Sequence, residues 1–122
     1  MTKAKKILII EDSKVISTVL LEVLKAEGYD VLWADNGVDG VRLAKSEKPD
    51  LILLDLLLPK LNGYEVCNAV KQNNTTRHIK VLIISTLDDK DHVEKAKLCG
   101  AKNFMKKPYD LQELLTEIKN II

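Results

Sequence analysis

The stretch Leu51-Ile-Leu-Leu-Asp-Leu-Leu-Leu-Pro59 is apolar throughout except for one acidic residue, Asp55. A short continuous apolar run is typical of a strand that is covered on both faces, as in a parallel sheet. A lone ionised carboxylate in such a run suffers a desolvation penalty unless a cation or hydrogen bonds compensate for it. We therefore expect a buried strand over residues 51–54, followed by a carboxylate that needs a partner.

The same kind of run recurs along the chain, and a helical pattern follows each one. The predicted strands are residues 6–10, 31–34, 51–54, 81–84 and 104–105. Apolar residues at the spacing of one helical face follow within residues 15–24, 38–44, 64–70, 93–99 and 111–118. Five strand-helix couplets with short connections predict an α/β fold, a doubly wound parallel sheet with helices on both faces.

Length and charge exclude several classes of protein. The 122 residues suit one domain, residues 1–122, and we expect no second domain within them. Nineteen Lys and Arg against eighteen Asp and Glu give a net charge of +1, which predicts no nucleic-acid or membrane partner. The apolar runs are far shorter than the roughly 20 residues of a membrane span.

Two cysteines, Cys67 and Cys99, are far apart in the sequence and form no C-x-x-C motif. Neither a zinc site nor a disulfide framework is indicated, so we interpret both as reduced packing residues. The N-terminal residues 1–6 do not begin a secretory signal. Together these features predict a cytoplasmic protein.

Polar residues follow the predicted strands at the edge where a doubly wound sheet carries its chemistry. Glu11 and Asp12 follow the first strand, Asp55 the third, Ser85 the fourth and Lys107 the fifth. Taken singly, Asp12 and the adjacent Ser13 suit a helix cap, Ser85 a local hydrogen bond and Lys107 a solvated loop. Asp55 is harder to explain in this way, because its charge needs either Lys107 or a metal ion.

The three carboxylates suggest a metal and a reaction. Hard oxygen ligands beside water suit Mg²⁺. A carboxylate next to Mg²⁺ can act as a nucleophile toward phosphorus and form an acyl phosphate. Lys107 and the metal would then neutralise the phosphoryl oxygens, and the Ser85 hydroxyl would donate a hydrogen bond to one of them.

Four motifs, each at the end of a predicted strand, resemble the response regulator receiver domain of two-component signalling, of the single-domain chemotaxis-regulator type. They are Ile7-Leu-Ile-Ile-Glu-Asp-Ser13, Leu51-Ile-Leu-Leu-Asp-Leu-Leu-Leu-Pro-Lys-Leu-Asn-Gly63, Val81-Leu-Ile-Ile-Ser-Thr86 and Gly100-Ala-Lys-Asn-Phe-Met-Lys-Lys-Pro-Tyr109. The resemblance covers essentially the whole chain. It implies a flavodoxin-like sheet of strand order 2-1-3-4-5.

The resemblance also implies roles for the acidic residues. Asp55 would accept a phosphoryl group from a histidine kinase or a histidine phosphotransfer protein. Asp12 and Asp55 would bind Mg²⁺ or Mn²⁺ directly, Glu11 through water, and Leu57 through its backbone carbonyl. The family is a signalling domain that promotes its own phosphorylation and dephosphorylation rather than an enzyme acting on a separate substrate.

Further roles follow for the remaining residues of the motifs. Lys107 would bind the phosphoryl group; it is preferred to Lys106 because the family's lysine precedes a proline, here Pro108, through a bond that is usually cis. Ser85 would be the switch hydroxyl and Phe104 the switch aromatic, although Phe104 also suits ordinary core packing.

The switch would change the face formed by the fourth helix, fifth strand and fifth helix. We expect a downstream protein target or effector domain to contact Lys95, Lys102, Lys106 and Tyr109 there. A solvated charged face would explain the lysines equally well.

Three other functions share parts of this pattern. A haloacid dehalogenase-type phosphatase needs a second Asp two residues after its nucleophile, where this chain has Leu57. A flavin-binding protein of the flavodoxin type needs a phosphate loop after the first strand, where Glu11 and Asp12 would repel phosphate. A degenerate receiver would keep the fold as a protein-binding module without the chemistry, yet the required residues are all present.

Overall fold

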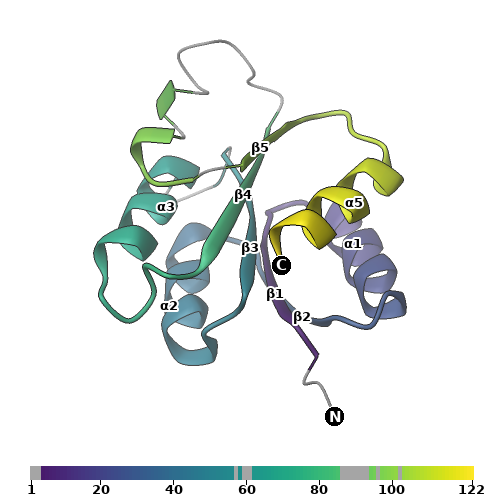
Figure 1. Ribbon diagram of the computed structural model, residues 1–122, viewed down its shortest axis with the longest axis horizontal. Helices are drawn as coiled ribbons and strands as arrows, with labels where there is room; N and C mark the ends of the chain where they lie inside the picture. Colours follow the sequence, from purple (N-terminus) through teal and green to yellow (C-terminus); the bar gives the residue numbers. More distant parts are fainter. Residues whose placement is uncertain (1–3, 57, 59–61, 86–93, 96, 102) are drawn as a thin grey trace.

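A computed structural model describes residues 4–56, 58, 62–85, 94–95, 97–101 and 103–122. Its centre is one sheet of five parallel strands in the order β2-β1-β3-β4-β5 (Figure 1). The strands are β1 (Lys6–Ile10), β2 (Asp30–Ala34), β3 (Leu51–Asp55), β4 (Lys80–Ser85) and β5 (Asn103–Lys106). The predicted doubly wound fold and strand order are confirmed.

Helices cover both faces of the sheet (Figure 1). On one side lie α1 (Lys14–Ala26) and α5 (Leu111–Ile121), and on the other α2 (Gly37–Glu47) and α3 (Gly63–Gln72). Of the fourth predicted helix, residues 94–95 and 97–98 are helical, and the rest of residues 93–98 lie outside the described part. None of the described helices has the length and apolarity needed to cross a bilayer.

Strands β1 and β3 are buried on both faces, as the apolar runs predict. Side chains of β1 and β3 alternate between the two cores. Leu8, Ile10, Ile52 and Leu54 face α2 and α3, whereas Ile7, Ile9, Leu51 and Leu53 face α1 and α5. All eight are at most 2% exposed. Because both faces of these strands are closely packed, the residues that follow at their carboxyl ends are held in fixed positions.

The apolar stripe of α1 is only partly buried. Leu20 and Leu24 lie in the core, but Val15, Ile16 and Val19 are 76%, 36% and 44% exposed. The exposed residues belong to the first half of the helix, and the two buried leucines lie in its second half. Spacing alone placed all these residues on one face and did not separate the two halves.

Candidate functional site

The register of the sheet brings Glu11 and Asp55 together. Ile10 of β1 is the partner of Leu54 in β3, so the residues that follow these two lie side by side at the carboxyl edge. The Glu11 N–H donates to Ala34 O at 3.1 Å and extends the ladder between β1 and β2 by one residue. Two carboxylates are thereby held next to each other by backbone pairing.

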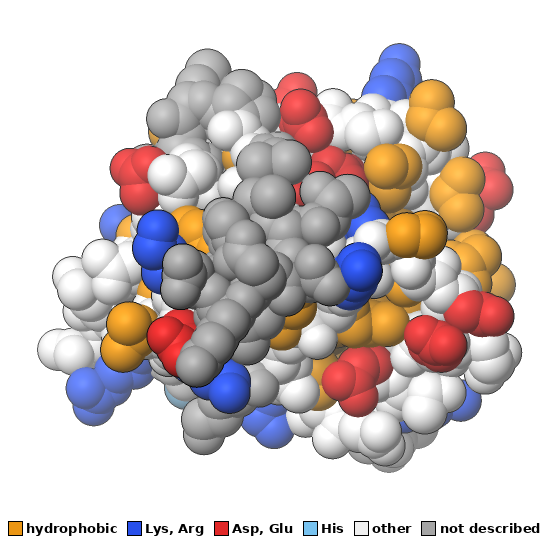
Figure 2. Space-filling model, turned by 90° about the horizontal axis from the view of Figure 1, so that it is seen from above, with side chains coloured by type: hydrophobic (Ala, Val, Ile, Leu, Met, Phe, Trp, Pro, Cys, Tyr) orange, Lys and Arg blue, Asp and Glu red, His pale blue; other side chains and the backbone are white. Residues whose placement is uncertain are grey.

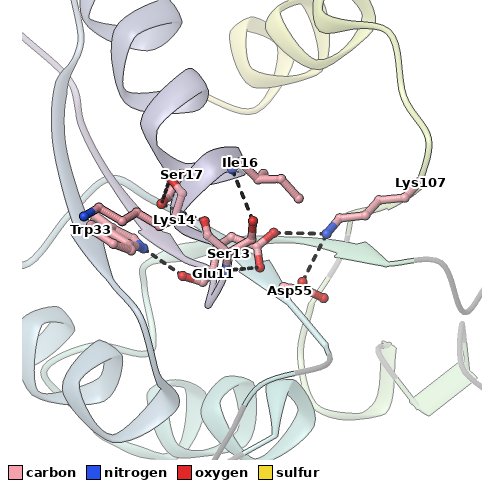
Figure 3. Close-up of polar contacts among 8 residues, drawn as sticks. All are labelled: Glu11, Ser13, Lys14, Ile16, Ser17, Trp33, Asp55 and Lys107. Carbon is pink, nitrogen blue, oxygen red and sulfur yellow. Dashed lines mark hydrogen bonds and ion pairs between the residues drawn. The ribbon is translucent and has the colours of Figure 1, made fainter.

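Lys107 lies between these two carboxylates (Figure 3). Its Nζ is 3.0 Å from Glu11 Oε1 and 3.1 Å from Asp55 Oδ2. The Lys107 N–H donates to Ser85 O at 2.8 Å, and the Lys107–Pro108 peptide bond is cis. Lys106 is exposed. The structure therefore places Lys107, rather than Lys106, at the acids, as expected.

The three groups are largely out of water. The side chains of Glu11, Asp55 and Lys107 are 6%, 11% and 19% exposed. Burial, together with the hydrogen bond and negative charge of Asp55, raises the pKa of Glu11 to about 7 despite the opposing effect of Lys107. Burial lowers the pKa of Lys107, but its bonds to Glu11 and Asp55 outweigh that effect and raise it. One lysine thus does not fully compensate for two buried carboxylates.

Asp12 adds a third carboxylate. Oxygens of Glu11, Asp12 and Asp55 all lie within 4.8 Å of one another, with Asp12 exposed to solvent. Three acidic groups against one lysine leave an excess of negative charge at this edge. A hard divalent cation with oxygen ligands fits this set of donors. The predicted carbonyl ligand, Leu57, lies outside the described residues.

Contacts from neighbouring elements fix Glu11. The Trp33 Nε1–H of β2 donates to Glu11 O at 2.7 Å, and the Ser13 N–H donates to Glu11 Oε2 at 3.4 Å (Figure 3). Ser13 Oγ accepts from the Ile16 N–H at 3.3 Å, so Ser13 is the N-cap of α1. Sequence reasoning did not find Trp33, because an aromatic residue in an apolar strand gives no sign of a polar contact with backbone.

The predicted switch residues, Ser85 and Phe104, lie on the neighbouring strands β4 and β5. Ser85 ends β4, is fully buried and pairs in register with Lys106. Phe104 of β5 is half-buried and packs against the core on the side of α2 and α3. The structure brings neither side chain into the contacts described for Lys107. Their roles in switching stay predictions.

The residues predicted for partner contacts are only partly described. Lys95 and Lys106 are exposed and Tyr109 is half-buried, whereas Lys102 lies outside the described residues.

An apolar groove borders the acidic site. It has a volume of about 500 Å³ and lies between the first turns of α1 and the segment that follows β5. Its lining comprises Val15, Ile16, Val19, Leu20, Lys107, Pro108, Tyr109 and Leu111. In a view onto the carboxyl edge, hydrophobic side chains gather at the right, where α1 and α5 lie in Figure 1 (Figure 2). Lys107 thus belongs both to the groove and to the acidic site.

We expect Glu11→Gln to stabilise the protein without divalent cations, more at pH 8 than at pH 5. A carboxyl whose pKa is raised by folding, here from 4.5 to about 7, costs nothing below the lower value and destabilises increasingly as pH rises through this window. The full effect is on the order of 3 kcal/mol. Urea unfolding of the wild type and Glu11→Gln, with a chelator present, measures this effect at the two pH values. The same difference in free energy of unfolding at pH 5 and pH 8 would contradict the raised pKa of Glu11.

Comparisons with known proteins agree with this geometry. Residues 7–119 match the model of the response regulator receiver domain. The chain is 37% identical to Protein PilH of Pseudomonas aeruginosa over 96% of this chain and 97% of PilH. It is 39% identical to the transcriptional regulatory protein PhoP of Bacillus subtilis over 97% of this chain, but it spans only 48% of PhoP.

A solved structure is similar throughout. It is the receiver domain of the sensor histidine kinase PA1611 from Pseudomonas aeruginosa, which has a magnesium ion coordinated in its active site cleft. It superposes with a TM-score of 0.88 at 26% identity and covers 97% of each chain. The strand order, the acidic cluster with its lysine, and these matches together show that the chain belongs to the response regulator receiver domain family of two-component systems.

Proposed function

We propose that the chain accepts a phosphoryl group on Asp55 from a phosphohistidine of a histidine kinase or a histidine phosphotransfer protein. The observation that supports this most directly is the position of Asp55, 3.1 Å from Lys107 Nζ and within the cluster of Glu11 and Asp12. Such a carboxylate is paired with a cation yet remains at an edge that solvent can reach beside the exposed Asp12. These are the conditions that a nucleophile toward phosphorus needs.

The transfer forms one bond and breaks one. An Asp55 Oδ attacks phosphorus, the bond from phosphorus to the donor imidazole nitrogen breaks, and that nitrogen keeps the electron pair and takes a proton from water. Lys107 donates to a phosphoryl oxygen as its bond to Asp55 is released. Asp12 and Asp55, Glu11 through water, and the Leu57 carbonyl would hold Mg²⁺ or Mn²⁺. The ion supplies neutralisation of the phosphoryl charge.

Phosphorylation would alter the balance of charge at the edge. The phosphoryl group brings roughly −1.5 to −2 in place of the carboxylate's own charge, a net change of about −1, with three strong acceptor oxygens. Ser85 and Lys107 are drawn toward these oxygens, and Phe104 adjusts with β5. The face of the fourth helix, β5 and α5 then presents Lys95, Lys102, Lys106 and Tyr109 to a downstream target in a changed arrangement.

The donor protein would dock on the apolar groove beside Lys107. Exposed valine and isoleucine side chains of α1 form one wall, and Lys107 connects the groove to Asp55. A helix that carries the donor histidine can bury its apolar residues there and still point the phosphoryl group at the acids. The groove thereby gives the partner a place from which Asp55 is within reach.

The alternative, a degenerate receiver that binds partners without phosphorylation, is less well supported because Asp55, Asp12 and Lys107 lie together as the chemistry requires. A cytoplasmic location remains a prediction from the sequence.

We expect Asp55→Asn to abolish labelling by a small phosphodonor such as acetyl phosphate in the presence of Mg²⁺. The amide has no charge with which to attack phosphorus. The matched control is Asp35→Asn, which changes an exposed aspartate directly after β2 at the same edge and should label like the wild type. Intact mass or phosphate-affinity gel electrophoresis detects the product. Undiminished labelling of Asp55→Asn would refute Asp55 as the acceptor.

Asp12→Asn should weaken Mg²⁺ binding by about ten- to a hundredfold, since it removes one of the few charged ligands. The single tryptophan, Trp33, donates to the Glu11 carbonyl and so provides a fluorescence signal inside the protein. Titration with MgCl₂ gives the affinity of each variant. The same affinity for Asp12→Asn and the wild type would rule out Asp12 as a ligand.

The groove is tested by Val15→Gln. Val15 is 76% exposed, so its change should leave folding intact while it reduces apolar contact with a docked donor. We expect phosphotransfer from a phosphorylated histidine phosphotransfer protein that acts on the wild type to slow about tenfold, the equivalent of about 1.4 kcal/mol. The rate of labelling of Val15→Gln by acetyl phosphate should equal that of the wild type. The control is Val38→Gln, which alters an exposed valine of α2 and should react with both donors at the wild-type rate. Equal slowing with acetyl phosphate would show damage to the site instead.

A further inference from the structure

Cys67 and Cys99 lie together, although 32 positions separate them in the sequence. Cys67 of α3 is fully buried, and Cys99, next to the helical residues 97–98, is half-buried. The Cys67 thiol donates to Cys99 O, with a distance of 3.3 Å from Sγ. A hydrogen bond also links the two side chains. Both cysteines are free, and they form a pair that their spacing in sequence did not predict.

The turn that carries Cys99 is well defined. The Cys99 N–H donates to Lys95 O at 3.0 Å, and the Gly100 N–H donates to Lys97 O at 3.1 Å. Gly100 has a φ of +100°, and a Cβ there would lie 2.7 Å from Lys71 Cγ. The stem of Lys71 therefore packs directly against the turn. Its Nζ donates to Arg77 O, which holds the charged end in place.

The surroundings of the two sulfur atoms differ. The hydrogen bond from Cys67, the N–H groups of Ala101 and Cys99, and the charge of Lys71 lower the pKa of Cys99 to about 7, against the effect of burial. The pKa of Cys67 is raised by the same hydrogen bond and by its burial in the core. At neutral pH a large fraction of Cys99 is the nucleophilic thiolate and Cys67 remains the thiol.

We propose that Cys99 and Cys67 are a peroxide-responsive thiol pair that forms an intramolecular disulfide. The Cys99 thiolate attacks one oxygen of hydrogen peroxide, the O–O bond breaks, and Cys99 sulfenic acid and hydroxide are formed. The Cys67 sulfur then attacks the Cys99 sulfur. The bond between Cys99 sulfur and the sulfenic oxygen breaks, and the OH group leaves with the proton of the Cys67 thiol as one molecule of water. Peroxide is reduced by two electrons and the two thiols are oxidised by two.

The fold already brings the two residues into contact. Cys67 Sγ lies 3.3 Å from the Cys99 carbonyl oxygen, so the two side chains start from neighbouring residues rather than from distant parts of the molecule. The disulfide would join α3 to the segment that leads into β5, which carries Phe104 and is followed by Lys107. An external dithiol returns the pair to the reduced form by exchange.

The test is to treat the reduced full chain with hydrogen peroxide and to measure its intact mass and cysteine-containing peptides. We expect a monomer that has lost two hydrogen atoms, a cross-linked peptide pair that contains Cys67 and Cys99, and full recovery with dithiothreitol. Before oxidation, iodoacetamide should alkylate Cys99 about tenfold faster than Cys67. Retention of both thiols, or oxygen added to Cys99 while Cys67 stays a thiol, would overturn the proposal.

Two variants separate the steps. In Cys67→Ala, peroxide should leave a Cys99 sulfenic acid that dimedone traps, because the resolving thiol is gone. In Cys99→Ala, which alters a half-buried residue and does not depend on replacing a core side chain, Cys67 should resist peroxide. Rapid oxidation of Cys67 in Cys99→Ala would refute the assigned order. These readouts do not involve Asp55, so they stand or fall independently of phosphorylation.

Discussion

The bridge from Lys107 to Glu11 and Asp55 is the interaction on which the rest of the site depends. Glu11 follows β1 and Asp55 ends β3, whereas Lys107 follows β5, and β4 lies between β5 and β3 in the sheet. The ammonium group therefore reaches across β4 to tie three strands at their carboxyl ends. Removal of Lys107 would leave both carboxylates without a counter-ion, and loss of one member of a buried ion pair typically costs about 3–5 kcal/mol. A change of charge at Asp55 is consequently felt at β5.

The bridge is also incomplete, and this incompleteness makes the site chemically useful. Two largely buried carboxylates share one lysine, and Asp12 adds a third at the solvent side. Burial first, and then the hydrogen bond and charge of Asp55, raise the pKa of Glu11 in spite of Lys107. A second lysine would have given a more stable edge, but it would have removed the attraction for a divalent cation. An excess of negative charge would favour binding of a cation at the expense of the stability of the cation-free protein.

Sequence patterns predicted the sheet, the helices on both faces and the meeting of Glu11, Asp55 and Lys107, because apolar runs and strand ends determine all three. The order of the strands came from the resemblance to a family. Three features were beyond the sequence: the bond from Trp33 to the Glu11 backbone, the exposed half of α1, and the contact of Cys67 with Cys99. Each depends on how elements far apart in the chain pack, which neither periodicity nor residue type records.

β5 joins the two reactive clusters of the molecule. The chain runs from Cys99, which contacts α3, through β5 to Lys107, which contacts β1 and β3. Phe104 and Lys106 of β5 pair in register with Ile83 and Ser85 of β4. We therefore expect this short strand to move as one unit. A covalent tie at Cys99 and a change of charge at Asp55 would therefore act on the same strand from its two ends. The proposed disulfide and the proposed phosphorylation would then be coupled through the energy of moving β5, and each would alter the other's equilibrium by the same factor.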